Sequence, residues 1–243
     1  MKILALDSSG LVASVALLEE DNCIAEYTIN YKKTHSQTLV PMLDEVSRMI
    51  DLDMKTIDAI AVAAGPGSFT GLRIGSATAK GLGQALNKPL IGIPTVDGLA
   101  YNLYGTDKVV CPLMDARRNQ TYTGLYEFVK KEGQYELTII KEQCAMALDE
   151  IIACINELGR EVIFLGDGVP VFKAQLEEKV TVPFSFAPAS CNRQRAAAIG
   201  SLAFSYAKEG KMEAAADHNP DYLRLSQAER ERAEKEKAEK SNA

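Results

Sequence analysis

Apolar and polar positions in the first hundred residues change their period several times, and each change predicts a new element of secondary structure. Three short apolar or alternating runs come first, and their tight spacing favours an antiparallel meander of strands. These predicted strands are residues 2–6, 11–18 and 24–31. The period then becomes that of one helix face, which predicts a helix over residues 36–50. The apolar face of this helix consists of Leu39, Leu43, Val46 and Ile50.

The rest of the chain alternates between strand-like and helix-like segments. Apolar and strand-like runs predict strands at residues 57–64, 90–93, 109–114, 122–128, 136–141 and 162–165. Helical periods predict helices at residues 71–86, 148–158 and 196–208. A faint repeat runs through this order, because one apolar run ends at Asp7 and another ends at Asp115. Each acid is followed by a polar turn and a strand-like stretch.

The repeat predicts two α/β lobes of similar plan. Residues 1–103 form the first lobe and residues 104–225 form a smaller second lobe, with a hinge near residues 95–108. Residues 226–243 consist almost entirely of charged and small residues, with Glu and Lys or Arg at helical spacing. This tail has almost nothing to bury, so it is predicted to be a solvated charged segment.

Composition and charge exclude several classes of protein. The chain has 243 residues, 47% apolar and 25% charged, which is typical of a globular protein, and no apolar run is long enough to cross a bilayer. With 27 basic and 33 acidic residues the net charge is −6, so we do not expect the chain to hold nucleic acid alone. Its five cysteines form no C-x-x-C pair, which predicts reduced thiols and a cytoplasmic location.

The strongest local motif is the glycine-rich block from Gly65 to Gly75, which follows a predicted buried strand and opens a predicted helix. Free backbone N–H groups at a helix N-terminus can receive an anion. The block lacks the Gly-Lys-Ser/Thr sequence of a P-loop, so close packing is the favoured interpretation and an anion or nucleotide site is the alternative. In that alternative Asp7 would hold a hydrated cation; otherwise it is a turn-forming acid. The candidate site residues are Asp7, Ser8, Ser9, Gly65, Gly67, Ser68, Gly166, Asp167 and Gly168.

The predicted helix over residues 71–86 is apolar around most of its circumference, although a surface helix needs only one apolar face. Small residues recur at every fourth position on one side, and close contact with another helix would offset the helix-weakening effect of the glycines. Two methionines on the helix over residues 36–50 suit a surface that meets more than one partner. The predicted interface residues are Leu39, Met42, Val46, Met49, Gly71, Gly75, Ala79 and Gly83.

Residues suited to catalysis are scarce. His35 and His218 are the only histidines, and neither has a second His or Cys at metal-ligand spacing. No G-x-S-x-G elbow occurs. The sequence therefore predicts no catalytic residue and no metal site, and it favours a hydrogen-bonding role for His35 at the start of a helix.

Several motifs together resemble those of the bacterial TsaB family, which is also called YeaZ. They are Asp7-Ser8-Ser9, His35-Ser36-x-x-Leu39-x-Pro41, the block from Gly65 to Gly75, Leu113-x-Asp115-Ala116-Arg117, Gly166-Asp167-Gly168 and Pro220-x-Tyr222-Leu223-Arg224. The resemblance implies an α/β protein with the actin-like ASKHA fold, in which two RNase H-like lobes each have a mixed sheet flanked by helices. The first turn lacks the glycine of the Asp-x-Gly sequence in actin-like ATPases, which fits a pseudo-enzyme.

The resemblance also implies a function. Members of that family are non-catalytic dimerisation subunits that bind TsaD and, with the ATPase TsaE, support transfer of a threonylcarbamoyl group to the adenosine beside the tRNA anticodon. The resemblance further implies that the chain meets tRNA only through the complex and pairs with itself when TsaD is absent. It binds no cofactor alone, since ATP or ADP and a metal belong to the partner subunits. A glycopeptidase-like metallohydrolase and a small-molecule kinase of the actin-like superfamily are the alternatives.

Overall fold

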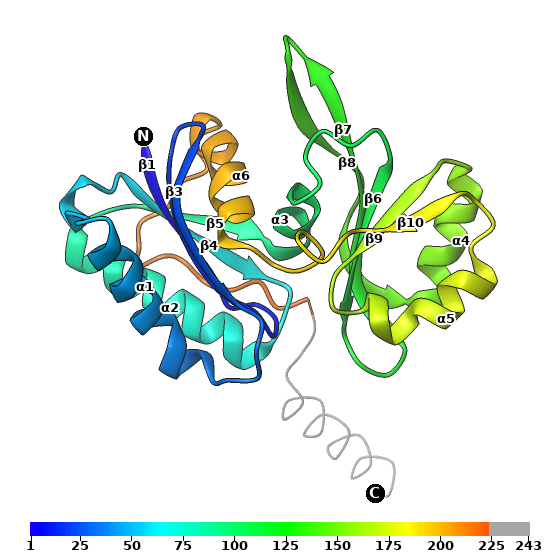
Figure 1. The fold of residues 1–243 in the computed structure, drawn as a ribbon, viewed down its shortest axis with the longest axis horizontal. Coiled ribbons are helices and arrows are strands. Elements are labelled where there is room, and N and C mark those ends of the chain that lie inside the picture. Colours follow the sequence, from blue (N-terminus) through cyan, green and yellow to red (C-terminus); the bar gives the residue numbers. More distant parts are fainter. Residues whose placement is uncertain (224–243) are drawn as a thin grey trace, which may run out of the picture.

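The structure is a computed structural model that describes residues 1–223 of the chain. These residues form two lobes that lie next to each other, each built on one five-stranded sheet (Figure 1). The predicted charged tail, residues 226–243, lies outside the described residues.

The first sheet has the strand order β3-β2-β1-β4-β5. Its strands are β1 (Lys2–Asp7), β2 (Ala13–Glu19), β3 (Asn22–Ile29), β4 (Ala59–Gly65) and β5 (Leu90–Pro94). The first three pair antiparallel, which confirms the predicted meander, whereas β4 pairs parallel with both β1 and β5. Nearly every residue of β1 and β4 is buried, which explains why both appear in the sequence as continuous apolar runs.

Helices cover both faces of this sheet. On one face α1 (His35–Met49) and α2 (Phe69–Leu86) pack against side chains such as Leu4, Leu6 and Val15. On the other face α6 (Ala196–Lys208) packs against Ile3, Ala5 and neighbouring residues. A short helical turn, η1 (Met54–Thr56), leads from α1 into β4. The predicted helices are thus confirmed, and the first lobe is a three-layer α/β/α unit.

The second sheet repeats the plan of the first. Its order is β10-β9-β6-β7-β8, in which the first three strands in sequence again pair antiparallel and the last two pair parallel. The strands are β6 (Val109–Asp115), β7 (Gln120–Lys131), β8 (Gln134–Ala147), β9 (Val162–Leu165) and β10 (Phe184–Phe186). Two helices, α4 (Leu148–Leu158) and α5 (Val169–Lys179), share one core with this sheet. The β7–β8 hairpin extends beyond the body of the lobe (Figure 1). The predicted actin-like fold with two mixed sheets is confirmed.

A short helix, α3 (Thr95–Tyr101), stands at the junction of the lobes, within the segment predicted as a hinge. The sequence pattern predicts neither α3 nor α5 nor β10. In α3 every residue except Tyr101 is buried, so the helix shows no polar face. In α5 only Phe172 and Leu176 are buried, so it shows hardly any apolar face.

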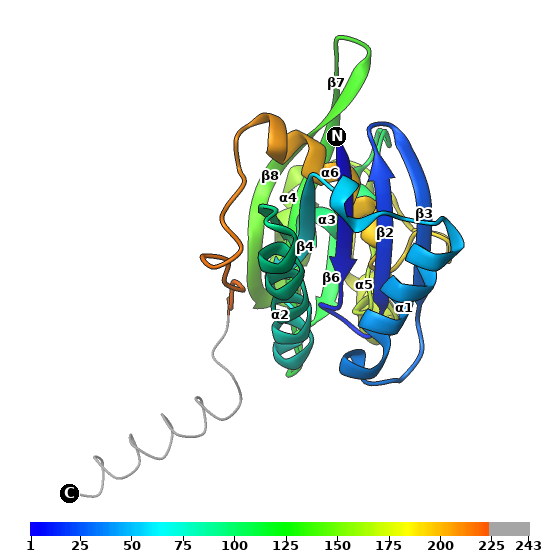
Figure 2. The same ribbon diagram turned by 90° about the vertical axis from the view of Figure 1, so that its left-hand side faces the viewer.

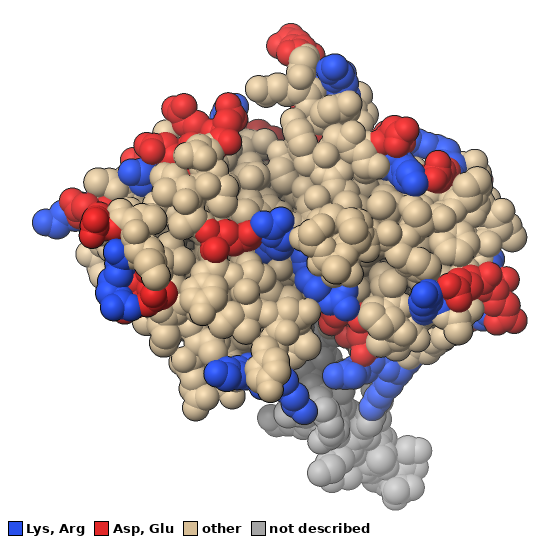
Figure 3. Space-filling view, viewed as in Figure 1, with Lys and Arg blue, Asp and Glu red and all other residues tan. Residues whose placement is uncertain are grey.

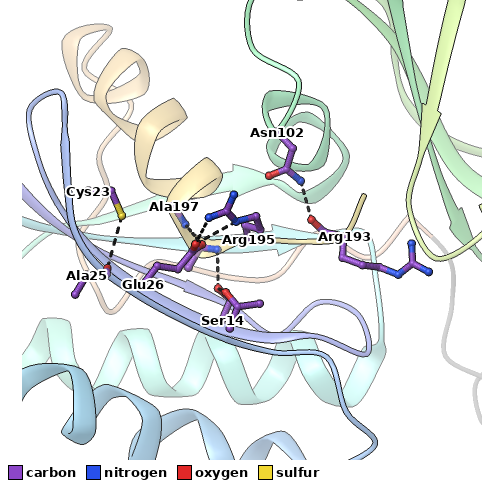
Figure 4. A network of polar contacts seen from close by, with 10 residues as sticks. Ser14, Cys23, Ala25, Glu26, Asn102, Arg193, Arg195 and Ala197 are labelled. Atoms are coloured by element: carbon purple, nitrogen blue, oxygen red, sulfur yellow. Dashed lines mark hydrogen bonds and ion pairs between the residues drawn. The ribbon is translucent and has the colours of Figure 1, made fainter. Parts of the chain in front are cut away.

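The chain returns to the first lobe at Arg195, whose guanidinium pairs with the Glu26 carboxylate of β3 (Figure 4). The N-terminus of α6 is held there as well. Ala196 N–H donates to Ser14 Oγ at 2.8 Å, and Ala197 N–H donates to Glu26 Oε1 at 3.1 Å. Residues from 196 onward therefore pack with the first lobe, although the sequence division places them with residues 104–225.

After α6 the chain continues down the side of the first lobe, alongside α2 (Figure 2). Glu213 and Leu90 exchange backbone hydrogen bonds of 2.9 Å, and Asp221 N–H donates to the Ala64 carbonyl oxygen at 2.7 Å. Lys80 Nζ on α2 donates to the carbonyl oxygens of Ala216 and His218. We call residues 209–223 the C-terminal strap, because they tie the end of the described chain to α2 and to the edge of the first sheet.

Candidate functional site

The turn after β1 is the first part of the candidate site, and it is closed. Asp7, Ser8 and Ser9 are each no more than 2% exposed. Asp7 Oδ1 accepts hydrogen bonds from Ser9 N–H at 2.9 Å and from Ser9 Oγ at 2.7 Å. Burial raises the pKa of Asp7 to about 6, although the bonds from Ser9 lower it in part. The backbone N–H group of Ser9 is thus already bonded within the turn itself.

The glycine block packs directly on this turn. A Cβ atom at Gly67 would lie 2.3 Å from the Ser9 carbonyl oxygen, and one at Gly71 would lie 2.1 Å from the Ser8 carbonyl oxygen. Ser68 N–H donates to the Ser9 carbonyl oxygen at 2.6 Å, and Ser8 Oγ donates to the Gly71 carbonyl oxygen at 2.8 Å. The glycines therefore serve the close approach of two backbone segments, which is the favoured sequence interpretation.

Gly65 connects the block to the lobe junction. Its φ of +121° favours glycine, and a Cβ atom there would lie 2.1 Å from the Asp221 carbonyl oxygen of the strap. Gly65 N–H donates to Thr95 Oγ1 on α3 at 3.1 Å, and its carbonyl oxygen accepts from Gln143 Nε2 on β8 at 3.2 Å. The end of β4 is thus bonded to the hinge and to the second lobe.

The second lobe contributes Gly166, Asp167 and Gly168, which follow β9. A Cβ atom at Gly166 would lie 2.1 Å from the Leu113 carbonyl oxygen, and that oxygen accepts from Gly168 N–H at 2.9 Å. Burial raises the pKa of Asp167, and the positive charge of Arg193 opposes this effect. Asp167 Oδ1 is buried without a hydrogen-bond partner among the described residues.

The return segment runs between the two halves of the candidate site. Asn192 accepts a backbone hydrogen bond of 3.0 Å from Gly166, while the Gln194 side chain lies against Gly10, beside the first turn. Gln194 is 1% exposed, and both of its amide atoms lack a hydrogen-bond partner within the described chain. Beside this segment the second lobe has a small cavity of about 210 Å³, with Phe164 and Phe186 in its apolar wall. The space between the turns is therefore occupied in part by the chain itself.

The predicted interface residues are mostly buried inside the chain. Met49 is 75% exposed. The other seven are buried, namely Leu39, Met42, Val46, Gly71, Gly75, Ala79 and Gly83. These seven residues therefore pack within the chain itself. Whether the outer sides of α1 and α2 meet a partner is untested and stays a prediction.

The smooth side of α2 has its neighbour within the same chain. A Cβ atom at Gly75 would lie 2.6 Å from Ser8 Oγ, and one at Gly83 would lie 2.8 Å from Ala215 Cβ in the strap. The second apolar side of this helix is thus covered by the first turn and by the C-terminal strap, elements that are distant from it in the sequence.

The two histidines are engaged in separate contacts. His35, the first residue of α1, makes a hydrogen bond of 2.8 Å through Nε2 with the Gly10 carbonyl oxygen, so its predicted role at the helix start is confirmed. His218 Nδ1 lies 2.6 Å from Glu213 Oε1. Residues 1–223 contain no group of three His, Cys, Asp or Glu side chains placed to hold a metal ion.

Three further features concern helix hydrophobicity, the cysteines and the charged surface. None of the helices described is both long enough and apolar enough to cross a membrane. The five cysteines form no disulfide. Lys and Arg side chains and Asp and Glu side chains are spread over both lobes on the face shown in Figure 3.

The repeated topology, with a polar turn after the first strand of each lobe, defines an actin-like two-lobed protein whose first turn packs on the glycine block of its own chain. Residues 22–232 match the family model described as TsaD, tRNA N6-adenosine threonylcarbamoyltransferase. The chain belongs to this family, and within it to the TsaB proteins.

The individual relatives agree with this placement. The tRNA threonylcarbamoyladenosine biosynthesis protein TsaB of Bacillus subtilis (strain 168) is 36% identical over 94% of this chain and 96% of its own length. The protein of the same name from Escherichia coli (strain K12) is 32% identical over 52% of this chain and 55% of its own length. A solved structure from Pseudomonas aeruginosa, described as similar to peptidase YEAZ, superposes with a TM-score of 0.74 at 26% identity and covers 92% of this chain and 99% of its own.

The sequence analysis does not single out three polar residues that lie at the junction of the lobes. They are Asp97, Gln143 and Gln194. Each is a single polar residue, and nothing in its immediate neighbours indicates a distant contact. The one available signal is an acid within the apolar stretch from Val96 to Leu99, because a carboxylate in such a segment needs a polar partner when it is buried.

Proposed function

We propose that this chain is a non-catalytic accessory subunit in the biosynthesis of threonylcarbamoyladenosine in tRNA. The B. subtilis relative is named for this pathway, and the family model that matches residues 22–232 is that of the threonylcarbamoyltransferase itself. In the proposal the chain binds TsaD and, with the ATPase TsaE, supports threonylcarbamoyl transfer to the adenosine beside the anticodon. It acts in the cytoplasm, meets tRNA only through the complex, and pairs with a second copy when TsaD is absent.

The packing of the turn after β1 supports the proposal that the chain is non-catalytic. A phosphate at this turn would need the Ser9 N–H group, which donates to Asp7. The carbonyl oxygens of Ser8 and Ser9 also lie against Gly71 and Gly67, so one side of the turn is packed on the glycine block. This packing supports a structural role for the turn. We infer that the chain binds no cofactor by itself, and that ATP or ADP and the metal ion belong to the partner subunits.

Reconstitution tests the proposal. The purified chain is combined with TsaD, TsaE, a threonylcarbamoyl donor and unmodified tRNA, and the modified nucleoside is measured by mass spectrometry. Omitting the chain should lower the initial rate of modification at least tenfold, which corresponds to about 1.4 kcal/mol in the activation free energy. Asp7→Asn should support the same yield as wild type, because Asp7 takes no part in the reaction. Modification by the chain alone, or a folded Asp7→Asn protein that binds TsaD but fails to support the yield, would contradict the proposal.

Two other classes make different predictions for the isolated chain. A small-molecule kinase should bind ATP tightly, whereas the proposed accessory subunit should give a dissociation constant weaker than about 1 mM in isothermal titration. A metallohydrolase should retain a stoichiometric metal ion after purification, which elemental analysis detects. Among the described residues no group of three His, Cys, Asp or Glu side chains is placed to hold a metal ion, which supports an accessory subunit over a metallohydrolase.

A further inference from the structure

Helix α3 is wedged between the two lobes and contacts both. Val96, Leu99 and Ala100 belong to one buried cluster with residues of β6 and β7 in the second lobe. On another side of the helix, a Cβ atom at Gly98 would lie 2.3 Å from Ile199 Cδ1 on α6, the helix that covers the first sheet. The lobes therefore meet in part through this short helix, alongside the direct hydrogen bond between Gln143 and Gly65.

The same helix places a carboxylate between hydroxyl groups from the two lobes. Tyr126 on β7 of the second lobe donates to Asp97 Oδ1 at 2.7 Å. Tyr206 on α6, which packs with the first lobe, donates to Asp97 Oδ2 at 3.4 Å. Asp97 is 3% exposed and Tyr126 is fully buried. A buried carboxylate needs such donors, because an unpaired charge away from water is strongly unfavourable.

We propose that Asp97 is a positioning residue that locks the lobe junction: its carboxylate holds Tyr126 of the second lobe and Tyr206 of the first-lobe layer, and the lock is strongest when the carboxylate is ionised. Hydrogen bonds to an ionised acceptor are roughly twice as strong as those between neutral groups. When Asp97 gains a proton, both bonds weaken and the two lobes lose part of their connection. This inference concerns the isolated chain and is independent of the proposed role in tRNA modification.

The surroundings of Asp97 place this change near neutral pH. The pKa of Asp97 is raised to about 6, mainly by burial and in part by the nearby Glu142 carboxylate of β8, while the hydroxyls of Tyr126 and Tyr206 oppose this rise. An acid whose pKa is raised on folding stabilises the folded chain through its protonated form. For Asp97 this net contribution to stability is complete below pH 3.8 and is lost as the pH rises through about 6. The hydrogen bonds from the two tyrosines have the opposite dependence on pH, because they are stronger when the carboxylate is ionised. Their contribution grows as the pH rises, which separates the lock from simple burial.

A mutant cycle at two pH values tests the lock. Tyr126→Phe is made in the wild-type chain and in Asp97→Asn, and melting is followed by circular dichroism at about pH 7.5 and about pH 5. In the wild-type background the substitution should lower the Tm by roughly 4–8 °C at the higher pH and by less than half as much at the lower pH. In the Asp97→Asn background this dependence on pH should disappear. Tyr27→Phe, at a 39% exposed position on β3, is the matched control and should change the Tm little at either pH.

Hydrogen–deuterium exchange provides the second readout. At about pH 7.5, peptides covering residues 95–101 should exchange at least threefold faster in Tyr126→Phe than in wild type, because the junction opens more often. Equal Tm losses at the two pH values, or the same dependence on pH in the Asp97→Asn background, would overturn the proposal. If Asp97→Asn does not fold, Tyr206→Phe replaces it. Combined with Tyr126→Phe it should show a loss that departs from additivity at the higher pH, and strict additivity there would count against the lock.

Discussion

Two glycines of one helix, Gly71 and Gly81, provide a sharp test of how the first turn is closed. Both lie inside α2, so alanine has the same intrinsic effect on the helix at each position. Their surroundings differ. A Cβ atom at Gly71 would lie 2.1 Å from the Ser8 carbonyl oxygen, whereas one at Gly81 would have no heavy atom within 4 Å. Any difference between Gly71→Ala and Gly81→Ala therefore reports the contact with the turn.

The geometry sets the size of the effect. A carbon atom and a carbonyl oxygen approach to about 3.3–3.6 Å, so the turn or α2 must move by roughly 1 Å to admit a methyl group at Gly71. Overpacking of this kind costs about 1–3 kcal/mol, and contact with buried backbone favours the upper end. Alanine also favours the helix over glycine by about 1 kcal/mol, which offsets part of this cost. We expect a net loss of about 2 kcal/mol for Gly71→Ala, a fall in Tm of roughly 4–8 °C, and a rise of about 2–4 °C for Gly81→Ala.

Circular dichroism melts of the two variants, with titration against TsaD, measure both consequences. If the small side of α2 meets the first turn, Gly71→Ala should melt lower than wild type and its folded fraction should bind TsaD normally. The reasoning would be refuted by a Gly71→Ala protein that melts like Gly81→Ala. A normal melt together with weak binding to TsaD would instead place Gly71 in the partner surface, against its burial in the structure.

Two further predictions concern Asp7 and the C-terminal strap. Because burial raises the pKa of Asp7 to about 6, its contribution to stability is complete below 3.8 and is lost as the pH rises through about 6. Urea unfolding should therefore show that Asp7→Asn gains stability relative to wild type across this range, and a constant difference between the two proteins would contradict this expectation. A chain that ends at residue 208 should melt about 5 °C or more below one that ends at residue 223, since it lacks the strap contacts with Leu90 and Lys80. Equal melting of the two truncated chains would show that the strap does not stabilise the first lobe.

The period of the apolar residues predicts a helix that buries one face along its length, and a strand that buries one face or both. The central strands β1 and β4 and the helices α1 and α2 are of this kind, and so the first lobe follows from its sequence. The pattern does not predict α3, since a helix buried on nearly all sides has no polar face to define its period. It does not predict α5 for the opposite reason, because only two of its residues are buried.

For the candidate site, the sequence predicts a close contact but does not identify the residues that make it. The repeat of glycines and alanine in α2 predicts close contact with another helix; the close contact is present, but it is made by the turn after β1 and by the C-terminal strap. The sequence does not identify these neighbours, because Ser8 and Ala215 are both far from the helix along the chain. Only the topology, which places β1 beside β4 and returns α6 to the first sheet, brings them to the same side of α2.

The two lobes share one topology, yet the turns after their first strands have different surroundings. In the first lobe α2 presses its glycines onto the turn, and Asp7 becomes a buried acceptor for Ser9. In the second lobe the corresponding acid, Asp115, accepts from Arg117 N–H at 2.8 Å and pairs with an Arg117 side chain that is 86% exposed. Both acids accept a hydrogen bond from the backbone two residues further on, but one is buried beneath the glycine block and the other pairs with an exposed arginine. The repeated fold thus places the same kind of turn in two different surroundings, because the glycine-rich helix packs on the turn of the first lobe.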